Sequence, residues 1–279
     1  MSRCVLMMAC CSASWDGRVM RPLQSTSDRI NPTSGGPSMF DNARVFQILP
    51  LITDARSAGE VISLFREAVV GLGADAGVFL SCLRDDATRT SLRSLWACDP
   101  SWAADYALHR WFEHDPWLRY ASCDAEPTRS SNLVFSSPKE VAFIRAAAEH
   151  GFASALIAPA PSSVGLSRVG VLCLGSADPE RFEGEKYPQV RVLARALSME
   201  LHHSIAKSMR EELLRGASLT EADLHLLRCE AAGHSSKVIG AAINLEAKTI
   251  DSRFQRVNAK LGAPDRRTAV RIARLYGLL

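Results

Sequence analysis

Residues 248–262 read Lys-Thr-Ile-Asp-Ser-Arg-Phe-Gln-Arg-Val-Asn-Ala-Lys-Leu-Gly. Apolar side chains recur at spacings of four, three and four residues, the period of an amphipathic helix; they are Ile250, Phe254, Val257 and Leu261. Gly262 ends the pattern, and Pro264 prevents the helix from continuing. The face opposite the apolar stripe is polar, with Thr249 and Arg253 at its borders; it carries Lys248, Asp251, Ser252, Gln255 and Arg256.

Three further helices are predicted around this one. The first is capped by Thr220, with Asp223 placed to complete a capping box, and it ends at Gly233. Ser235 caps the second, whose predicted inner face is Val238, Ile239 and Ala242, and the tight turn Asn244-Leu-Glu246 follows. The fourth is capped by Asp265; its predicted inward residues are Ala269, Val270, Ile272 and Ala273. Two helices joined by a short turn, the second with a polar face, indicate a helix-turn-helix.

The charge of this region indicates the class of partner. Residues 248–274 hold eight Lys or Arg and two Asp, whereas the whole chain has a net charge of only +3, so the remainder is net acidic. Localised positive charge on a helix is the electrostatic footprint of nucleic-acid binding. Lys and Arg grip phosphates, and Ser and Gln read base edges. The sequence therefore predicts that this domain binds duplex DNA.

Residues 219–279 resemble the LuxR-type helix-turn-helix domain. The matching residues are Leu219-Thr220, Leu227, Gly233, Lys237-Val-Ile-Gly-Ala, Lys248-Thr-Ile250 and Lys260-Leu-Gly262. Asp223 and Arg253 depart from the family, which usually has Glu and His at these positions. The resemblance implies that Asp251, Ser252 and Gln255 face base edges. It also implies phosphate contacts and a dimer on an inverted-repeat operator; the expected phosphate-contacting residues are Lys248, Thr249, Arg253 and Arg256, and we add Lys260 to the DNA-binding set.

Length and composition suit a two-domain globular protein: 279 residues, 47% hydrophobic and 23% charged. No apolar stretch is long enough to span a bilayer, so we expect no membrane association. The eight cysteines show neither CxxC pairing nor zinc spacing, which favours free thiols in the cytoplasm and no metal site. Catalytic motifs such as GxSxG, HExxH and the P-loop are missing from the sequence, so we expect neither an enzyme nor a cofactor.

The first 38 residues differ in composition from the rest. They contain no Lys and no Glu and end in Asn31-Pro-Thr-Ser-Gly-Gly-Pro-Ser38, a composition typical of a disordered tail. We interpret residues 1–38 as disordered or as an N-terminal extension from a wrongly assigned start.

Residues 39–206 mix helical and strand patterns. Helices are predicted over 55–72, 101–110, 138–150 and 182–209, and strands over 76–83, 91–96, 152–158 and 167–174. Turn residues at Arg84-Asp-Asp86 and a loop at 159–165 favour antiparallel neighbours. The fold class is therefore α/β plus all-α: an α/β/α sandwich, a polar linker at 207–218, and the four-helix domain at 219–279.

A candidate binding site lies in the middle of the α/β segment. Trp102 and Tyr106 are four residues apart and share a helix face. Asp115 precedes a proline, which favours an extended backbone there. Aromatic rings with polar tips beside a carboxylate can line an apolar pocket that fixes a polar head group. A core aromatic pair beside a turn Asp is the alternative interpretation. We count Trp117, Arg129 and Cys173 as further candidate ligand contacts.

With Gly151-Phe152 and the Val169-Gly-Val-Leu strand, this pattern resembles the autoinducer-binding domain of quorum-sensing LuxR regulators over about residues 45–205. The resemblance implies that Trp102 donates to the lactone carbonyl of an acyl-homoserine lactone, Asp115 accepts from its amide, and Tyr106 packs the acyl chain. An aromatic residue usual after Pro127 is missing from Thr128-Arg-Ser-Ser-Asn-Leu133. This departure leaves three possibilities open: a different signal, weak lactone binding or an empty pocket.

Two functions follow from these patterns. The first is a homodimeric transcription regulator controlled by a small signal such as an acyl-homoserine lactone. The alternative is a ligand-independent or antagonist relative that pairs with another regulator.

Overall fold

The computed structural model describes residues 40–84, 90–162 and 168–279 of the chain. The predicted tail 1–38, most of the turn after Arg84 and the end of the loop that begins at Pro159 lie outside these residues. The described chain forms two compact units, divided between Ser204 and Ile205.

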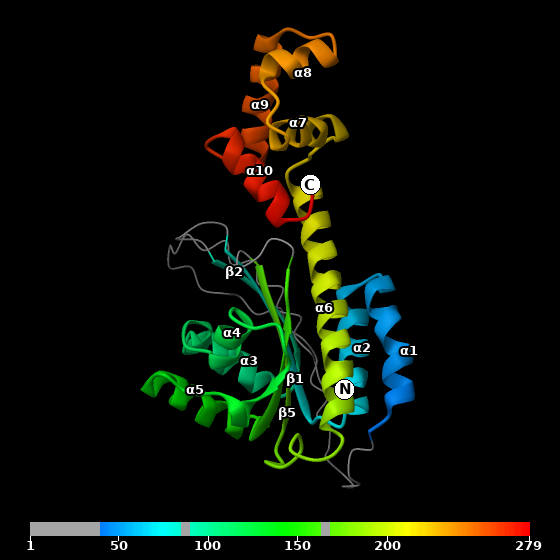
Figure 1. Ribbon diagram of the computed structural model, residues 1–279, viewed down its shortest axis with the longest axis vertical. Coiled ribbons are helices and arrows are strands. Elements are labelled where there is room, and N and C mark those ends of the chain that lie inside the picture. Colours follow the sequence, from blue (N-terminus) through cyan, green and yellow to red (C-terminus); the bar gives the residue numbers. More distant parts are fainter. Residues whose placement is uncertain (1–39, 85–89, 163–167) are drawn as a thin grey trace. The chain divides into compact units, whose positions relative to one another are not determined.

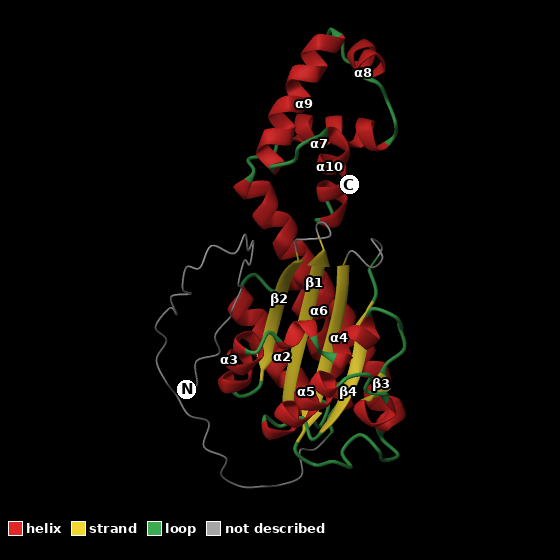
Figure 2. Ribbon diagram, turned by 90° about the vertical axis from the view of Figure 1, so that its left-hand side faces the viewer, coloured by secondary structure: helices red, strands yellow, loops and turns green. Residues whose placement is uncertain are grey.

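The first unit is an antiparallel sheet between two layers of helices. Its strands are β1 (Ala76–Arg84), β2 (Thr90–Ala97), β3 (Thr128–Arg129), β4 (Ser154–Ala160) and β5 (Arg168–Ser176), in the order β2-β1-β5-β4-β3. One face is covered by α1 (Asn42–Asp54), α2 (Ala58–Gly71) and α6 (Tyr187–Gly216) (Figure 1). The other is covered by α3 (Pro100–Leu108), α4 (Pro116–Ala121) and α5 (Pro138–Glu149) (Figure 2). The predicted α/β/α sandwich is therefore confirmed.

Alternation along β1 directs its side chains to the two layers. Val78, Leu80 and Cys82 belong to the cluster beneath α3, α4 and α5, because successive residues of a strand point to opposite faces of the sheet. Gly175 on β5 makes room for an aromatic ring, since a Cβ there would lie 2.2 Å from Cδ1 of Phe152. This close approach brings Phe152 down onto the sheet in the aromatic layer.

The helix α6 differs from the prediction at both ends. It begins at Tyr187 rather than at residue 182, and it continues to Gly216 through the segment expected to be a linker. Residues 207–215 read Lys-Ser-Met-Arg-Glu-Glu-Leu-Leu-Arg, and most of these residues favour helix. The polar composition is therefore that of an exposed helix, and most of the segment predicted as a polar linker at 207–218 is helical.

The second unit contains the four predicted helices: α7 (Glu221–Ala231), α8 (Ser236–Ala242), α9 (Ala247–Leu261) and α10 (Arg266–Leu275). The capping box of Thr220 and Asp223 is present, and Ser235 and Asp265 cap α8 and α10. Gly262 ends α9 with a φ of +62°, in the left-handed region that glycine adopts without a steric cost.

The inner face predicted for α8 was partly wrong. Ile239 is buried, but Val238 is 52% exposed and Ala242 is also exposed. A second buried position on α8 is Gly240, where a Cβ would lie 2.3 Å from the carbonyl oxygen of Leu245. The backbone of the turn, rather than an apolar side chain, therefore packs on this helix.

Candidate DNA-binding helix and sensor site

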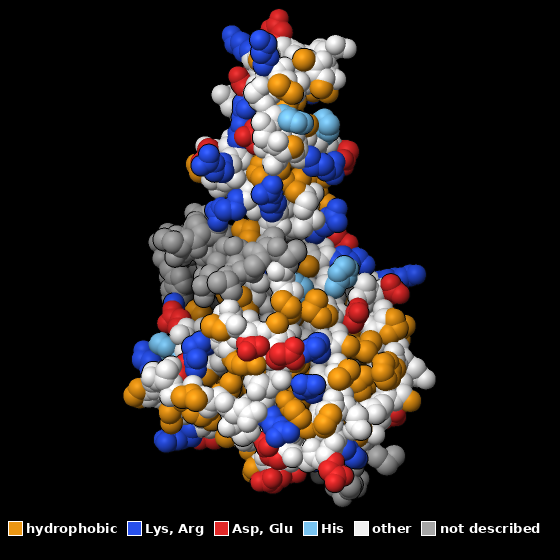
Figure 3. All heavy atoms as spheres, viewed as in Figure 1, with side chains coloured by type: hydrophobic (Ala, Val, Ile, Leu, Met, Phe, Trp, Pro, Cys, Tyr) orange, Lys and Arg blue, Asp and Glu red, His pale blue; other side chains and the backbone are white. Residues whose placement is uncertain are grey.

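The helix α9 is held by an apolar stripe that faces the core of the second unit. Ile250, Phe254 and Val257 are almost completely buried, as predicted. They pack with Leu227 of α7 and Ala273 of α10 in one cluster. Lys and Arg side chains are prominent on the surface of this unit seen in Figure 3. Because the stripe fixes the rotation of α9, it also fixes which residues face outward.

The outward face contains several side chains that are available for a partner. Lys248, Ser252, Gln255 and Arg256 are exposed. Thr249 and Arg253 are half-buried, at the borders where the sequence places them. Within the described part of the chain, Lys248, Arg253 and Arg256 form no ion pair, so their charges are available to an anionic partner.

Two residues expected to contact DNA have partners inside the domain instead. Asp251 accepts from Ser236 Oγ at 2.6 Å and from Arg266 at 2.5 Å. These hydrogen bonds lower the pKa of Asp251 below its ordinary value, and the bond from Ser236 has the largest effect. Lys260 donates to Asp223 at 2.7 Å and to the carbonyl oxygen of Ser218 at 2.9 Å. These contacts fasten α9 to its neighbours within the domain.

In the first unit, the candidate site is built around Asp115, the N-cap of α4. One carboxylate oxygen accepts from the backbone N–H groups of Trp117 and Leu118, at 2.8 and 3.1 Å. The other accepts from the Tyr106 hydroxyl at 2.8 Å. Burial raises the pKa of Asp115 to about 6, despite these three hydrogen bonds. Burial and the nearby Asp115 also raise the pKa of Tyr106 well above its ordinary value.

An aromatic cluster surrounds this carboxylate. Phe143 of α5 lies at its centre, with ring centroids 5.7 Å from Trp102, 6.2 Å from Tyr106 and 5.0 Å from Trp117. Trp102, Tyr106 and Trp117 are each at most 3% exposed. Cys173 of β5 belongs to the same buried cluster, and the pKa of its thiol is raised by burial and by Asp115. Five of the six predicted ligand contacts therefore gather in one place.

Arg129 is the exception among the predicted ligand contacts. Its guanidinium pairs with Glu183 at 2.8 Å and lies 3.8 Å from the ring centroid of Tyr187, at the start of α6. Neighbouring residues of a strand point to opposite faces, and Arg129 pairs with Leu156, whereas Thr128 pairs with Ile157 of the aromatic cluster. Arg129 therefore lies apart from the place where the other five residues gather.

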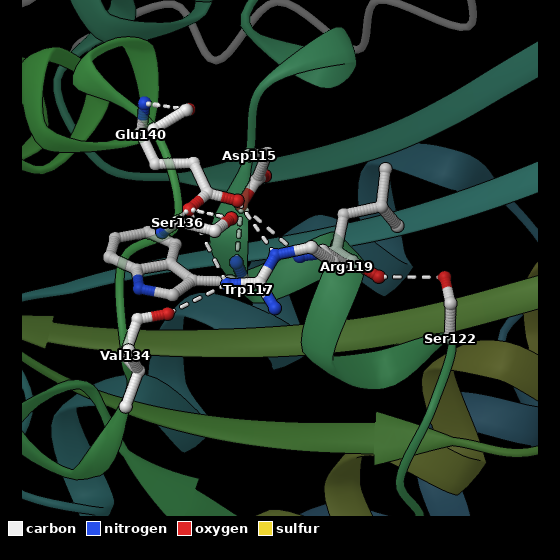
Figure 4. A network of polar contacts seen from close by, with 9 residues as sticks. Asp115, Trp117, Arg119, Ser122, Val134, Ser136 and Glu140 are labelled. Carbon is white, nitrogen blue, oxygen red and sulfur yellow. Dashed lines mark hydrogen bonds and ion pairs between the residues drawn. The ribbon is translucent and has the colours of Figure 1, made fainter.

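A polar network that the sequence did not lead us to predict joins α4 to α5 (Figure 4). The carboxylate of Glu140 is almost fully buried and accepts from Arg119 Nε at 2.7 Å. It also accepts from the backbone N–H and the hydroxyl of Ser136, at 2.5 and 2.8 Å. Arg119 in turn donates to the carbonyl oxygen of Val134 at 2.9 Å. The only sequence signal for it was Ser137 with Glu140 three residues later, the pattern of a capping box.

Among residues 40–84, 90–162 and 168–279, no three His, Cys, Asp or Glu side chains gather in a way that could hold a metal ion. No described helix combines the length and the apolar character needed to cross a membrane.

An α/β/α domain with a buried carboxylate among aromatic rings, followed by a helix-turn-helix, defines a two-domain class of DNA-binding regulators. The autoinducer binding domain family matches residues 57–205, and the luxR family of bacterial regulatory proteins matches residues 217–273. The chain therefore belongs to the LuxR-type family of autoinducer-binding transcription regulators. A comparison with curated proteins gave no match.

Solved structures support the same fold. Escherichia coli SdiA superimposes with a TM-score of 0.67 at 16% identity, over 84% of this chain and 97% of that one. SdiA in complex with octanoyl-rac-glycerol gives a TM-score of 0.64 at 14% identity, over 83% and 93% of the two chains. At these identities the likeness concerns the fold alone.

Proposed function

We propose that this regulator binds duplex DNA through the outward face of α9 as a homodimer on an inverted repeat. The observation that supports DNA binding is a set of exposed side chains on a helix whose opposite stripe is buried. They are Lys248, Gln255 and Arg256. The basic side chains hold phosphates, and Gln255 and Ser252 read base edges. Asp251 and Lys260 take positioning roles because their partners lie inside the domain.

We further propose that a small acyl signal, an acyl-homoserine lactone or a related compound, binds among Trp102, Tyr106, Asp115 and Trp117 and controls the regulator. The buried carboxylate at the centre of an apolar cluster supports this half. Such a site favours a ligand with a long apolar part and a polar head. That SdiA has been observed with octanoyl-rac-glycerol extends the candidates beyond lactones.

The test uses the full-length chain in two measurements. Duplexes are first selected from a random pool, and their affinity is measured by fluorescence anisotropy at increasing salt. We expect the logarithm of the affinity to fall linearly with that of the salt concentration, because each phosphate contact releases counterions. Selection of no duplex at low salt would contradict DNA binding by this chain alone and favour the pairing alternative.

Thermal unfolding is then measured with N-octanoyl-homoserine lactone and with octanoylglycerol. A ligand that binds only the folded state stabilises it and so raises the unfolding temperature. When the free ligand concentration is a hundred times the dissociation constant, the added stability is about 2.7 kcal/mol. Control compounds are octanoic acid and homoserine lactone, each of which has only one part of the proposed ligand. No shift with either acyl compound at saturation would contradict the proposed class of signal.

A further inference from the structure

The indole N–H of Trp117 is a buried donor with no hydrogen-bond partner. The residue is 2% exposed, so water does not replace the missing partner at the surface. From this geometry we infer that Trp117 donates a hydrogen bond to an acceptor oxygen of the bound signal, and is thereby a specificity-determining residue. This inference rests on the proposed function, whose ligand it defines more closely.

Two other indoles in the same unit show what is missing at Trp117. The indole N–H of Trp96 donates to Ser94 Oγ at 2.8 Å, and that of Trp111 donates to the Asp105 carboxylate at 3.0 Å. A buried polar group without a partner has a cost in free energy. A ligand that supplies an acceptor would remove that cost only in the complex, so the orphan donor would contribute to affinity.

The ring of Trp117 is fixed by its neighbours. Its centroid is 5.0 Å from that of Phe143 in an edge-to-face contact, and 5.5 Å from that of Phe152. The side chain is thus packed on both α5 and the segment just before β4. Close packing of this kind keeps the N–H from turning towards solvent.

The acceptors drawn near Trp117 in Figure 4 are already engaged. The Val134 carbonyl receives Arg119, and the Glu140 carboxylate receives Arg119 and Ser136. The Asp115 carboxylate receives three donors. None of these oxygens is a hydrogen-bond partner of the Trp117 N–H, so we assign the missing acceptor to a molecule from outside the chain.

The same contacts define the chemistry of the ligand. An indole N–H only donates, so the ligand must present an acceptor, such as a carbonyl oxygen, to Trp117. A carboxylate offers about four acceptor positions, and the three donors on Asp115 leave about one for an N–H or O–H of the ligand. An acyl amide or an acyl ester with a neighbouring hydroxyl satisfies both conditions, whereas a plain hydrocarbon satisfies neither.

The experiment compares the full-length variants Trp117→Phe and Trp111→Phe. Each is titrated with N-octanoyl-homoserine lactone and with octanoylglycerol, and its thermal stability is measured without ligand. Trp117→Phe should weaken binding of the acyl probe about tenfold, equivalent to ~1.4 kcal/mol. Its stability without ligand is measured separately, because the substitution removes an unsatisfied donor but also leaves a cavity in the core.

Trp111→Phe is the control. It loses the hydrogen bond to Asp105, so its stability should fall, whereas its affinity for the probe should be unchanged. In ¹⁵N-indole spectra of the unsubstituted protein, the Trp117 resonance should move more than that of Trp111 when the probe is added.

The results separate this inference from the proposed function. Equal affinity of the unsubstituted protein and Trp117→Phe for a probe, or an unmoved Trp117 indole resonance, would overturn the role of Trp117 and leave the proposed ligand class in place. A protein that binds neither acyl compound would overturn both.

Discussion

Asp115 is the central carboxylate of the candidate sensor site, and its protonation changes with pH. It is 4% exposed, and burial raises its pKa from 3.8 to about 6. Between these two values the unfolded chain has lost the proton while the folded chain keeps it. The folded state then binds more protons, so stability falls as the pH rises from about 4 to about 6.

We predict that Asp115→Asn removes this part of the pH dependence. The amide oxygen can still cap α4, and the amide nitrogen can donate to the Tyr106 oxygen, so the local geometry is preserved. The difference in free energy of unfolding between the variant and the unsubstituted protein should grow by an amount on the order of 3 kcal/mol from pH 4 to pH 7. Denaturant unfolding followed by tryptophan fluorescence measures it.

Asp99→Asn is the matched control for this measurement. Asp99 also caps a helix, but hydrogen bonds from the hydroxyl and the backbone N–H of Ser101 lower its pKa. Its contribution to stability is therefore lost only as the pH falls towards and below its ordinary value of 3.8. The decline between pH 4 and 6 should persist in Asp99→Asn; a parallel loss in both variants would rule out Asp115 as its source.

Single residues also show how far the sequence could predict the site. Trp102 and Tyr106 are four positions apart on one helix, and Asp115 precedes a proline, so local rules were enough to place them. The side of the sheet to which Arg129 points depends on the register of β3 with β4, which is not a local property. The unpaired state of Trp117 depends on every neighbouring acceptor and could not be predicted from sequence.

At the scale of elements, capping residues and apolar periods predicted the helix-turn-helix almost completely. The strands β1, β2 and β5 and the helices α2, α3 and α5 were also predicted within a few residues. The helix α4 was missed because six residues are too few to show a period. In α8, Val238 and Ala242 were assigned to the core by residue type, but the buried positions are Ile239 and Gly240, and the turn backbone at Leu245 packs on Gly240.

Substitutions on the outward face of α9 should distinguish contacts with phosphates from contacts with base edges. Arg256→Ala should weaken binding about equally on a selected duplex and on a random one, and should lower the slope of affinity against salt by about 1. Gln255→Ala should relax specificity at one base pair, by about 1–3 kcal/mol, with little change in that slope. Both are measured by anisotropy on the full-length protein.

Arg267→Ala is the control, because it removes the same charge as Arg256→Ala. The Arg267 side chain is exposed and lies on α10, outside α9. This substitution should change specificity at no base pair. If Gln255→Ala and Arg256→Ala lost affinity equally on selected and random duplexes, the outward face of α9 would have been assigned incorrectly.

At the scale of the whole molecule, each described unit has a buried hydrophobic cluster, and these two clusters share no residue. Phe143 is the centre of the aromatic cluster in the first unit, and Phe254 is a buried residue of the cluster in the second. Both side chains are at most 1% exposed. Loss of packing in one core should therefore leave the other core folded, since a domain with its own hydrophobic core can fold on its own.

We predict that Phe143→Leu and Phe254→Leu each lower the stability of one unit only, by about 1–3 kcal/mol. Tryptophan fluorescence should report Phe143→Leu alone, because all four described tryptophans belong to the first unit. Affinity for the selected duplex near the unfolding temperature should fall in Phe254→Leu, whereas its response to the acyl probe should be unchanged. A shift of the fluorescence transition in both variants would mean that the two units unfold as one, because a packing defect in either core would then destabilise the whole chain.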